Sequence, residues 1–382
     1  MYVCHLSVYR RNLVLEVGAF RSEYDGSQDY DLVLRISEKT TNIFHIPKIL
    51  YHWRTILGSS AADSFSKLYT VEASKKALED TLRRREKEGT VEIIPHKIGC
   101  YRVHLRILDN PLVSIIIPSG GKCINTINGK KCLLENCISS LINLTTYKNF
   151  EIIMVDGFDI HSDYLDKLLE YPNVNLIRSK EKFNFSQRIN LGAAGANGDF
   201  FLLLNDDVEV INPDWLVSLL EICQLEGIGA VGAKLFYPNY KLQHVGVVFP
   251  DKLPCHTFYG FKQKHSGYFN STILNRNYLA VTGACLMVSK RNFYKVNGFE
   301  ESLPLNFNDV DFCLKLHKAG YRNVFTPYAQ LFHFESATRQ KTVDLYEIEY
   351  LQNKWFSYLE SIGNDPYYNP NFSKSSFDFE LP

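Results

Sequence analysis

The sequence lacks several features that define other protein classes. Its 42 Lys and Arg residues balance 42 Asp and Glu residues, so no net charge attracts a polyanion and we expect no nucleic-acid partner. No stretch approaches the roughly 18 uninterrupted apolar residues that a membrane-spanning helix needs. Arg10 and Arg11 follow a weak apolar segment instead of preceding it, unlike the charges of a secretory signal peptide. These absences predict a soluble protein of the cytoplasm.

Paired cysteines are also missing. The nine cysteines are scattered without a CxxC spacing, and several lie inside apolar runs, such as Cys285 within residues 282–288. We interpret them as buried free thiols in a reducing compartment, in preference to disulfides or zinc ligands.

The sequence does contain enough apolar material for a large core, with 45% hydrophobic and 13% aromatic residues, and its length suggests two or more structural units. Apolar residues at helical spacing predict a helix over residues 60–88, followed by a β-like segment at 101–107. The tail from residue 341 begins helix-like and ends in a stretch rich in Asn, Pro, Phe and Ser, which we expect to be loosely ordered.

Apolar runs alternate with helical patterns in the middle of the chain. Runs at 113–117, 150–155, 173–177 and 200–204 are separated by helix-like stretches at 133–144, 162–170 and 186–196. This alternation predicts an α/β fold with a mostly parallel sheet covered on both faces. Ligands bind at the carboxyl ends of the strands in such sheets. The residues that follow the predicted strands are Ser119 to Lys122, Asp156, and Asn205 to Asp207.

An internal repeat relates the two ends of the chain. Segments at 17–20, 28–35, 46–47 and 51–53 match segments at 296–299, 308–315, 326–327 and 332–334 in order and, within a residue, in spacing. We interpret residues 1–59 as the C-terminal portion of a first, truncated domain. Nothing upstream supplies the strand series or an acidic cluster, so either the product is truncated or another chain provides the missing half.

Two acidic clusters are candidates for chemistry. Asp206 and Asp207 follow an apolar strand, where carboxylates are costly unless they are paired, hydrogen-bonded or metal-bound. Two interpretations of this pair are equally good. The acids bind a divalent cation together with a diphosphate, or one of them caps a helix. Asp309 and Asp311 begin a helical segment about 200° apart. One is a candidate general base and the other a cap, although two caps would also fit.

His333 lies among apolar residues, where a satisfied core histidine is the usual interpretation. Its counterpart in the repeat, His52, makes metal binding an equal alternative. His244, His256, Tyr259 and Phe261 occupy residues 237–280, where sugar stacking and ordinary packing are equally plausible.

Together these segments resemble the inverting family 2 glycosyltransferases of GT-A fold. The matching pieces, in the family's order, are residues 113–118, 150–156, 183–186 with Asn190, 205–207, 213–215, 282–287, Gly298 and Phe299 with 308–309, and His333. The tandem layout is similar to that of multidomain transferases that build rhamnose-containing or related bacterial surface polysaccharides.

The resemblance implies a role for each matching residue. The residues implied to contact the nucleotide sugar are Pro118, Ser119, Asp156 (to the base), Arg188 (near the diphosphate), Asn205 and Asp206. Asp207 and His333 would bind Mg²⁺ or Mn²⁺, and Asp309 would be the catalytic base, with Asp311 as structural support. The implied partners are a nucleotide-sugar donor and a glycan or lipid-linked saccharide acceptor. Peripheral association with the inner face of the membrane, and with other glycosyltransferase domains or chains, stays open.

The sequence departs from the family pattern at four places, one of which is the stretch after Asp156, where Gly-Phe-Asp replaces a small polar turn. Ser119 to Lys122 replaces the usual Thr, Tyr and Asn after the first strand, and Asn205 and Asn308 each stand where an acid is common. None of these changes removes the base or the last metal-binding acid, so we expect activity. A silent scaffold or glycan-binding module is the first alternative. A sugar nucleotidyltransferase is the second, although Gly120 to Lys122 is a weak match to its Gly-rich signature.

The predicted organisation has four parts. These are a truncated first glycosyltransferase domain at 1–59, a helical linker at 60–110, a complete GT-A domain at 111–340, and a C-terminal helix and tail at 341–382.

Overall fold

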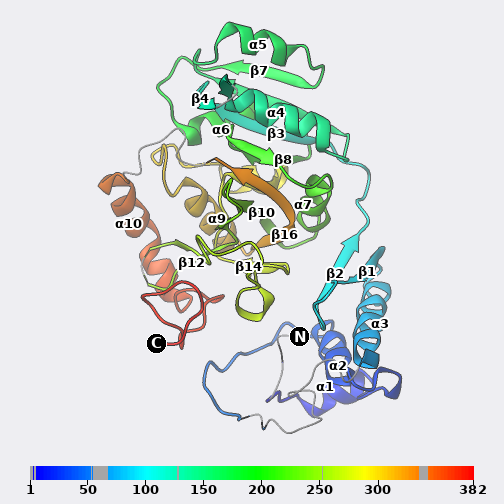
Figure 1. Ribbon diagram of the computed structural model, residues 1–382. Helices are drawn as coiled ribbons and strands as arrows, with labels where there is room; N and C mark the ends of the chain where they lie inside the picture. The colour runs from blue at the N-terminus through cyan, green and yellow to red at the C-terminus, as the bar shows by residue number, and fades with distance from the viewer. Residues whose placement is uncertain are drawn as a thin grey trace. The chain divides into compact units, whose positions relative to one another are not determined.

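The chain forms two compact units, Met1–Arg106 and Ile107–Pro382. The computed structural model describes residues 3, 6–52, 54, 68–126, 129–251, 253–334 and 343–382 (Figure 1). None of the helices in these ranges is both long and apolar enough to cross a membrane.

Unit 1 combines short helices with one two-stranded sheet. Its elements are α1 (Arg11–Glu16), η1 (Ser22–Tyr24), α2 (Gln28–Ser37), α3 (Leu68–Arg84), β1 (Gly89–Ile93) and β2 (Tyr101–Leu105). The helix predicted over 60–88 ends four residues early, and its first part, 60–67, lies outside the described residues. The early end has a local cause. Glu86 adopts a left-handed φ of 52°, and Gly89 already pairs with Leu105 in the sheet.

A similar hydrogen bond occurs within each copy of the sequence repeat. In unit 1, a helix of the repeat, α2, carries Arg35, whose Nη2 donates a hydrogen bond to the carbonyl of Ala19 at 2.7 Å. In unit 2, Lys315 on α9 (Asn308–Lys318) donates to the carbonyl of Gly298. Ala19 and Gly298 both adopt a left-handed φ, of 52° and 57°. Each copy therefore contains a left-handed turn closed by a basic side chain from the following helix.

Unit 2 is built on a large mixed sheet. The eight strands of its main path, in spatial order, are β14 (Arg276–Tyr278), β16 (Arg322–His333), β10 (Ile228–Phe236), β15 (Cys285–Ser289), β8 (Phe200–Leu204), β3 (Val113–Ser119), β6 (Phe150–Asp156) and β7 (Val174–Arg178). All of these except β14 and β15 run in the same direction. β11 (Leu242–His244) pairs with β10, and β9 (Val208–Val210) pairs with β16. The sheet is mostly parallel, as predicted.

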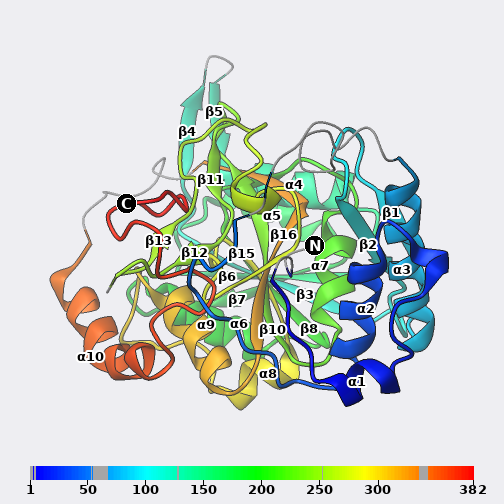
Figure 2. The same ribbon diagram turned by 90° about the horizontal axis from the view of Figure 1, so that it is seen from below.

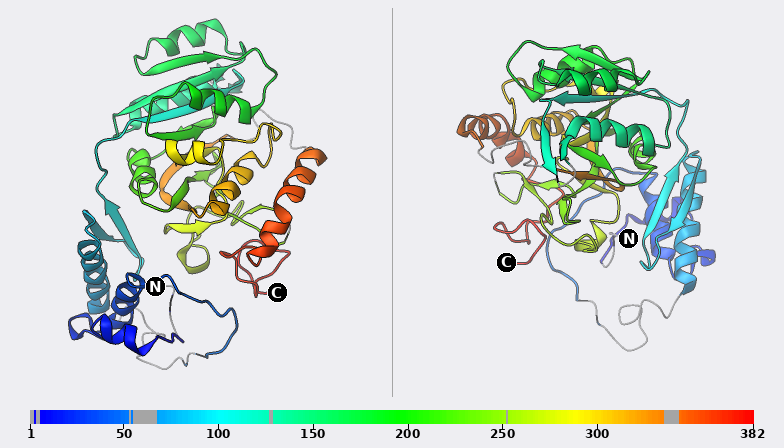
Figure 3. Two further views of the ribbon diagram at one scale, coloured as in Figure 1. Left: turned by 180° about the vertical axis from the view of Figure 1, so that it is seen from behind. Right: turned by 45° about the horizontal axis from the view of Figure 1, so that its top comes forward.

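Helices cover both faces of this sheet, as Figure 3 shows from two further directions. They are α4 (Leu133–Leu144), α5 (Ser162–Leu169), α6 (Phe185–Ala194), α7 (Trp215–Cys223), α8 (Lys290–Lys295), α9 and α10 (Leu345–Ser361). Side chains alternate between the two faces along each strand. In β3, Ile116 packs into one core with α6, α8, α9 and α10, while Ile115 and Ile117 pack into the other with α4, α5 and α7.

Three smaller elements complete unit 2. The hairpin of β4 (Cys123–Thr126) and β5 (Gly129–Cys132) projects from the body in Figure 2. A second small sheet pairs β12 (Val247–Val248) with β13 (Cys255–His256), and η3 (Tyr268–Asn270) follows.

The tail after α10 corrects a prediction. We expected loose order, yet Tyr368 and Phe379 are each only 6% exposed and belong to one of the two cores. The carboxylates of Asp365 and Asp378 accept hydrogen bonds from the backbone N–H groups of Phe249 (2.9 Å) and Phe258 (2.6 Å). The aromatic residues that looked like part of a low-complexity tail therefore fill the core beside β12 and β13.

The cysteines in the described part of the chain are free thiols, and most of them are buried. Cys4 lies outside that part.

Candidate active site

Ser119, the last residue of β3, joins two of the predicted nucleotide-binding residues. Its hydroxyl donates to Asp206 Oδ2 at 2.7 Å, and its carbonyl accepts from Arg188 Nη1 at 2.6 Å. Ser119 is fully buried, and Pro118 before it is a buried member of the same strand. Since β3 and β8 are parallel neighbours, their carboxyl ends meet at one edge, as the sequence predicted.

Arg188 lies on α6, and its side chain is held in a fixed pose. The guanidinium stacks on Phe183, 4.4 Å from the ring centre, and Nη2 lies 3.5 Å from Asp159 Oδ2. Its Nε has no hydrogen-bond partner among the described residues although the side chain is 2% exposed. A Cβ at Gly157 would lie 2.1 Å from Nη2, so the loop after β6 needs glycine there. A buried guanidinium with spare donor capacity suits a phosphate or diphosphate.

Asp156 ends β6 and is fully buried. Its Oδ1 accepts from the backbone N–H groups of Asp159 and Ile160, and its Oδ2 pairs with Arg178 Nη1 at 2.5 Å. A nucleotide base that contacts this carboxylate would share it with Arg178, which ends the neighbouring strand β7.

The two acidic residues after β8, Asp206 and Asp207, are largely shielded from solvent. Burial, and then the adjacent charge of Asp207, raises the pKa of Asp206 to about 6. Asp207 is only 5% exposed. Two neighbouring carboxyl groups withdrawn from water favour a bound cation, because it offsets both the lost hydration and their mutual repulsion.

His333 at the end of β16 faces this cluster. Its Nε2 lies 3.1 Å from Asp207 Oδ1 and 3.1 Å from Asn205 Nδ2. Its Nδ1 lies 2.8 Å from Gln243 Oε1, an atom that only accepts hydrogen bonds. With the hydrogen of a neutral ring on Nδ1, Nε2 is the acceptor for the Asn205 amide and the nitrogen that faces the Asp207 carboxylate.

These atoms fit a divalent cation. An imidazole nitrogen and a carboxylate oxygen that converge at 3.1 Å avoid repulsion when a proton or a cation lies between them, and both atoms can bind a metal. No group of three His, Cys, Asp or Glu side chains suited to a metal occurs in the described ranges. Two protein ligands leave positions for diphosphate oxygens, which is how Mg²⁺ is commonly bound. Asp207 and His333 would be these ligands.

Asp309, the second residue of α9, is presented by a neighbouring loop. Its Oδ2 accepts from the N–H of Gly283 at 2.7 Å, and the next residue, Ala284, accepts through its carbonyl from the N–H of Asn205 at 3.1 Å. Phe307 before the helix has a left-handed φ of 57°, a strained conformation for an aromatic residue. The candidate base and the acidic cluster are thus linked through two consecutive residues of one loop.

Asp311 faces away from Asp309, as the helical spacing predicted. It is fully buried, its Oδ1 accepts from Trp355 Nε1 at 2.7 Å, and it lies 2.8 Å from Lys354 Nζ. It fastens α10 to α9, which Figure 3 shows close together.

Several site residues escaped the sequence reasoning. Arg178 carried a usable signal, since it directly follows a predicted strand, and Asp159 lies three residues past another strand end. Gln243 carried none, because β11 is only three residues long. His244 was considered as a sugar-stacking residue, but it is fully buried and packs inside the domain.

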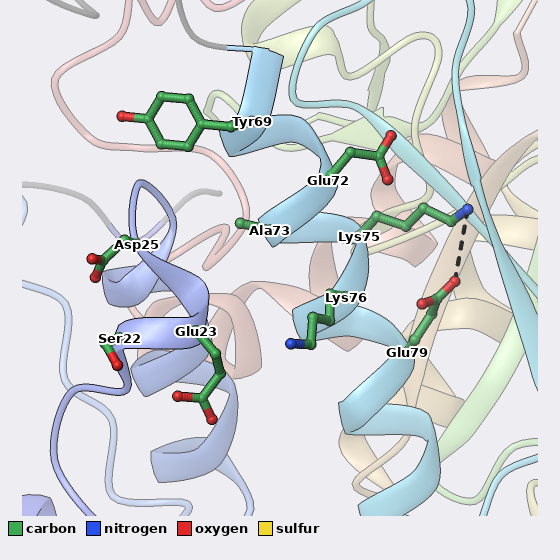
Figure 4. A pocket seen from close by; sticks show the side chains of 9 residues that line it. All are labelled: Ser22, Glu23, Asp25, Tyr69, Glu72, Ala73, Lys75, Lys76 and Glu79. Carbon is green, nitrogen blue, oxygen red and sulfur yellow. Dashed lines mark ion pairs between the residues drawn. The ribbon is translucent and has the colours of Figure 1, made fainter.

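A hollow in unit 1, drawn in Figure 4, offers no comparable chemistry. It is lined by residues of η1 and α3 and the turn after η1: Ser22, Glu23, Asp25, Tyr69, Glu72, Ala73, Lys75, Lys76 and Glu79. Its four carboxylates outnumber its two ammonium groups, and Lys75 already pairs with Glu79 at 3.8 Å.

Comparison with known proteins agrees with this geometry. Residues 114–295 match the family described as Glycosyl transferase family 2. This part of the chain belongs to glycosyltransferase family 2. The matched range runs from β3 through α8 and includes every candidate site residue except Asp309 and His333.

Three relatives extend the comparison. A protein of Sinorhizobium fredii named y4gI is 39% identical over the whole chain, which covers 42% of that relative. The O-antigen biosynthesis protein RfbC of Myxococcus xanthus is 33% identical over the whole chain, which covers 29% of it. The N-acetylglucosaminyl-diphospho-decaprenol L-rhamnosyltransferase of Mycobacterium tuberculosis is 24% identical over 53% of this chain and 72% of its own length. The chain spans less than half of the first two proteins.

The fold is that of GT-A glycosyltransferases. The crystal structure of GalNAc-T7 with UDP, GalNAc and Mn²⁺ superposes with a TM-score of 0.50 at 14% identity, over 65% of this chain and 50% of that one.

Proposed function

We propose that this family 2 glycosyltransferase moves a sugar, with inversion, from a nucleoside-diphosphate donor to an acceptor hydroxyl in the synthesis of a bacterial surface polysaccharide. The observation that carries the proposal is the arrangement at the sheet edge. The Asp207–His333 pair lies there, and the loop next to Asn205 presents the Asp309 carboxylate.

Donor binding follows from the buried polar groups at the strand ends. Arg188 would pair with the diphosphate, while Pro118, Ser119 and Asp156 would border the nucleotide, with Asn205 and Asp206 beside them. A Mg²⁺ or Mn²⁺ ion held by Asp207 and His333 would neutralise charge that develops on the departing nucleoside diphosphate. GalNAc-T7, a structural neighbour, was crystallised with Mn²⁺.

Asp309 would act as the general base. It would accept the proton of the acceptor hydroxyl as that oxygen attacks the anomeric carbon from the face opposite the leaving group. One displacement of this kind inverts the anomeric configuration without a covalent intermediate.

The names of the relatives suggest the pathway class. One relative is named for O-antigen biosynthesis, and another for rhamnosyl transfer to a diphospho-decaprenol-linked sugar. We therefore propose that the donor carries a deoxyhexose or hexose. We also propose that the acceptor is a glycan or a lipid-linked saccharide at the inner face of the membrane.

We also propose that residues 1–59 are the C-terminal portion of another GT-A domain, joined by a linker at 60–110 to the domain at 111–340 and the tail at 341–382. Supporting this, the segment that corresponds to β16 in the repeat exposes Ile43 (65%), Phe44 (88%), Ile46 (63%) and Ile49 (75%). The structure assigns no strand to this segment. Apolar residues on both sides of an extended segment suit a strand inside a sheet, so we expect it to pair with strands of other glycosyltransferase sequence.

The test is a donor screen. The purified chain is incubated with UDP-, dTDP- and GDP-sugars, Mn²⁺ or Mg²⁺, and simple or lipid-linked saccharide acceptors, while nucleoside diphosphate release is followed. Asp309→Asn and Asp207→Ala are run beside Asp166→Asn, a matched change at an exposed carboxylate on α5.

Metal-dependent turnover with one donor, lost in both site variants but kept in Asp166→Asn, supports the proposal. Product anomers identified by NMR test inversion. A chain that binds no nucleotide sugar would instead be the silent scaffold or glycan-binding module considered above.

A further inference from the structure

A fully buried histidine and a half-buried one form a hydrogen-bonded pair next to the candidate base. His244 on β11 is fully buried, and its Nδ1 lies 2.9 Å from Nδ1 of His256 on β13. The two rings meet edge to face, with centres 5.0 Å apart. Neither residue is among the groups assigned above to the donor, the metal or the acceptor.

The backbone fixes which nitrogen of each ring carries hydrogen. The N–H of Thr282 donates to His244 Nε2 at 3.3 Å, so Nε2 is an acceptor and the hydrogen of the neutral ring is on Nδ1. That Nδ1–H then donates to His256 Nδ1, which must be the acceptor, so the hydrogen of His256 is on Nε2. Burial, and then the neighbouring His256 and His333, lowers the pKa of His244 well below its usual value, which keeps the ring neutral.

Thr282 connects this pair to the chemistry. The next backbone N–H, that of Gly283, donates to Asp309 Oδ2 at 2.7 Å. There is little slack at this contact, because a Cβ on Gly283 would lie 3.2 Å from the Cβ of Asp309. A rotation of the Thr282–Gly283 backbone would therefore move the carboxylate or break its hydrogen bond.

We propose that His244 is a positioning residue for the catalytic base, holding the Thr282–Gly283 backbone so that Gly283 N–H aims Asp309, and that His256 holds His244 in the required tautomer. This inference rests on the proposed function of Asp309. A packing role alone would not need this arrangement, since an apolar ring at position 244 would fill the same space without burying two hydrogen-bonding nitrogens.

The rings use different nitrogens as acceptors, which gives a sharp test. Gln places its side-chain oxygen near the position of histidine Nε2, and Asn places it near Nδ1. His244→Gln therefore retains the acceptor for Thr282, while His244→Asn and His244→Leu lose it. At position 256 the order reverses, because His256→Asn retains the acceptor for His244 and His256→Gln does not.

The readouts are kcat, the KM of donor and acceptor, Mn²⁺–nucleotide affinity and the melting temperature. We expect kcat to fall on the order of 10²-fold in His244→Leu, as for other small misplacements of reacting groups, with the nucleotide affinity unchanged. His244→Gln should recover most of this loss and His244→Asn little of it. Equal kcat in all three variants, or a loss of nucleotide affinity that parallels the loss of kcat, would overturn the proposal.

A second measurement does not depend on turnover. Histidine ¹⁵N–¹H correlation spectra of the full chain should show, among the rings with hydrogen on Nδ1, one whose signal disappears in His244→Gln while that of His333 remains. A doubly protonated His244 ring, or a His244 ring with hydrogen on Nε2, would contradict the proposed hydrogen-bonded pair. If the spectra show the stated tautomer but no donor is turned over or bound, the proposed function is wrong, while the hydrogen-bonded pair of His244 and His256 is confirmed. If the wild type is active and Asp309→Asn is inactive while His244→Leu keeps full kcat, only the positioning role has failed.

Discussion

At the scale of the residue, the site depends on groups that set the direction of other groups. The contact between His333 Nδ1 and Gln243 Oε1 turns the other ring nitrogen, Nε2, toward Asp207. Such partners of a metal-binding histidine fix its tautomer and orientation, and their loss usually costs 10- to 100-fold in metal affinity.

Gln243→Leu should therefore weaken Mn²⁺ binding in the presence of a nucleoside diphosphate by about 10- to 100-fold. Gln243→Glu keeps an acceptor oxygen at the same place and should bind Mn²⁺ more tightly than the leucine variant. Titration calorimetry measures both affinities. A leucine variant with wild-type affinity would show that Gln243 does not orient the ring.

Gly283→Ala tests the contact between Gly283 and the candidate base Asp309 by adding a group to it. The added methyl group would press on the Cβ of Asp309 at 3.2 Å, so the carboxylate must shift by a few tenths of an ångström. We expect kcat to fall by about tenfold or more, with donor KM nearly constant. Steady-state kinetics measure both values. Gly227→Asn is a suitable control, since Gly227 has a left-handed φ of 76° and open space around it.

Sequence reasoning located those site residues that stand at strand ends or helix starts. Ser119, Asp156 and Asp207 could be found because a parallel sheet brings its carboxyl ends together whatever the details of packing. Gln243 and His244 could not, because their importance comes from contacts between segments about 40 to 90 residues apart.

At the scale of the element, predictions were best where periodicity is local. The helix expected at 133–144 is α4 without a shift, and that expected at 162–170 is α5 at 162–169. The apolar runs at 113–117 and 150–155 are both strands, each slightly longer than predicted. The second half of the sheet was not predicted, since β10, β15 and β16 join it by pairings in both directions that sequence pattern does not encode.

The docking of α10 depends on one buried polar contact. Trp355→Phe removes the N–H that Asp311 accepts and leaves this buried carboxylate one donor short. We expect a loss of about 1–3 kcal/mol in the free energy of unfolding, measured by urea denaturation. Tyr358→Phe on the same helix, which loses a less buried hydrogen bond to His317, should cost less. An equal cost in both variants would count against a special role for Asp311.

At the scale of the whole molecule, every candidate site residue lies in unit 2, Ile107–Pro382. A fragment of residues 107–382 should therefore fold and bind nucleoside diphosphate and Mn²⁺ with an affinity within a few-fold of that of the full chain. Circular dichroism and calorimetry decide this. A folded fragment that has lost binding would mean that unit 1 contributes to the site.

Stability should depend on pH through the tail. Burial raises the pKa of Asp365 from 3.8 to about 7, so between these values the folded chain retains a proton that the unfolded chain has lost. The free energy of unfolding must then fall as pH rises through this window, by roughly 4 kcal/mol at most. Asp365→Asn cannot ionise and should flatten the decline between pH 4 and 7 in urea denaturation. A slope as steep as that of the wild type would assign it to other groups.

Strand β11 has a consequence for how this domain tolerates insertions and deletions. Its adjacent residues Gln243 and His244 point to opposite faces, one toward His333 and the other toward Thr282. A single residue added to or removed from the turn at 237–241 would exchange those faces. Metal coordination and base alignment would then fail together, so length changes in this short turn should be far more damaging than most substitutions within it.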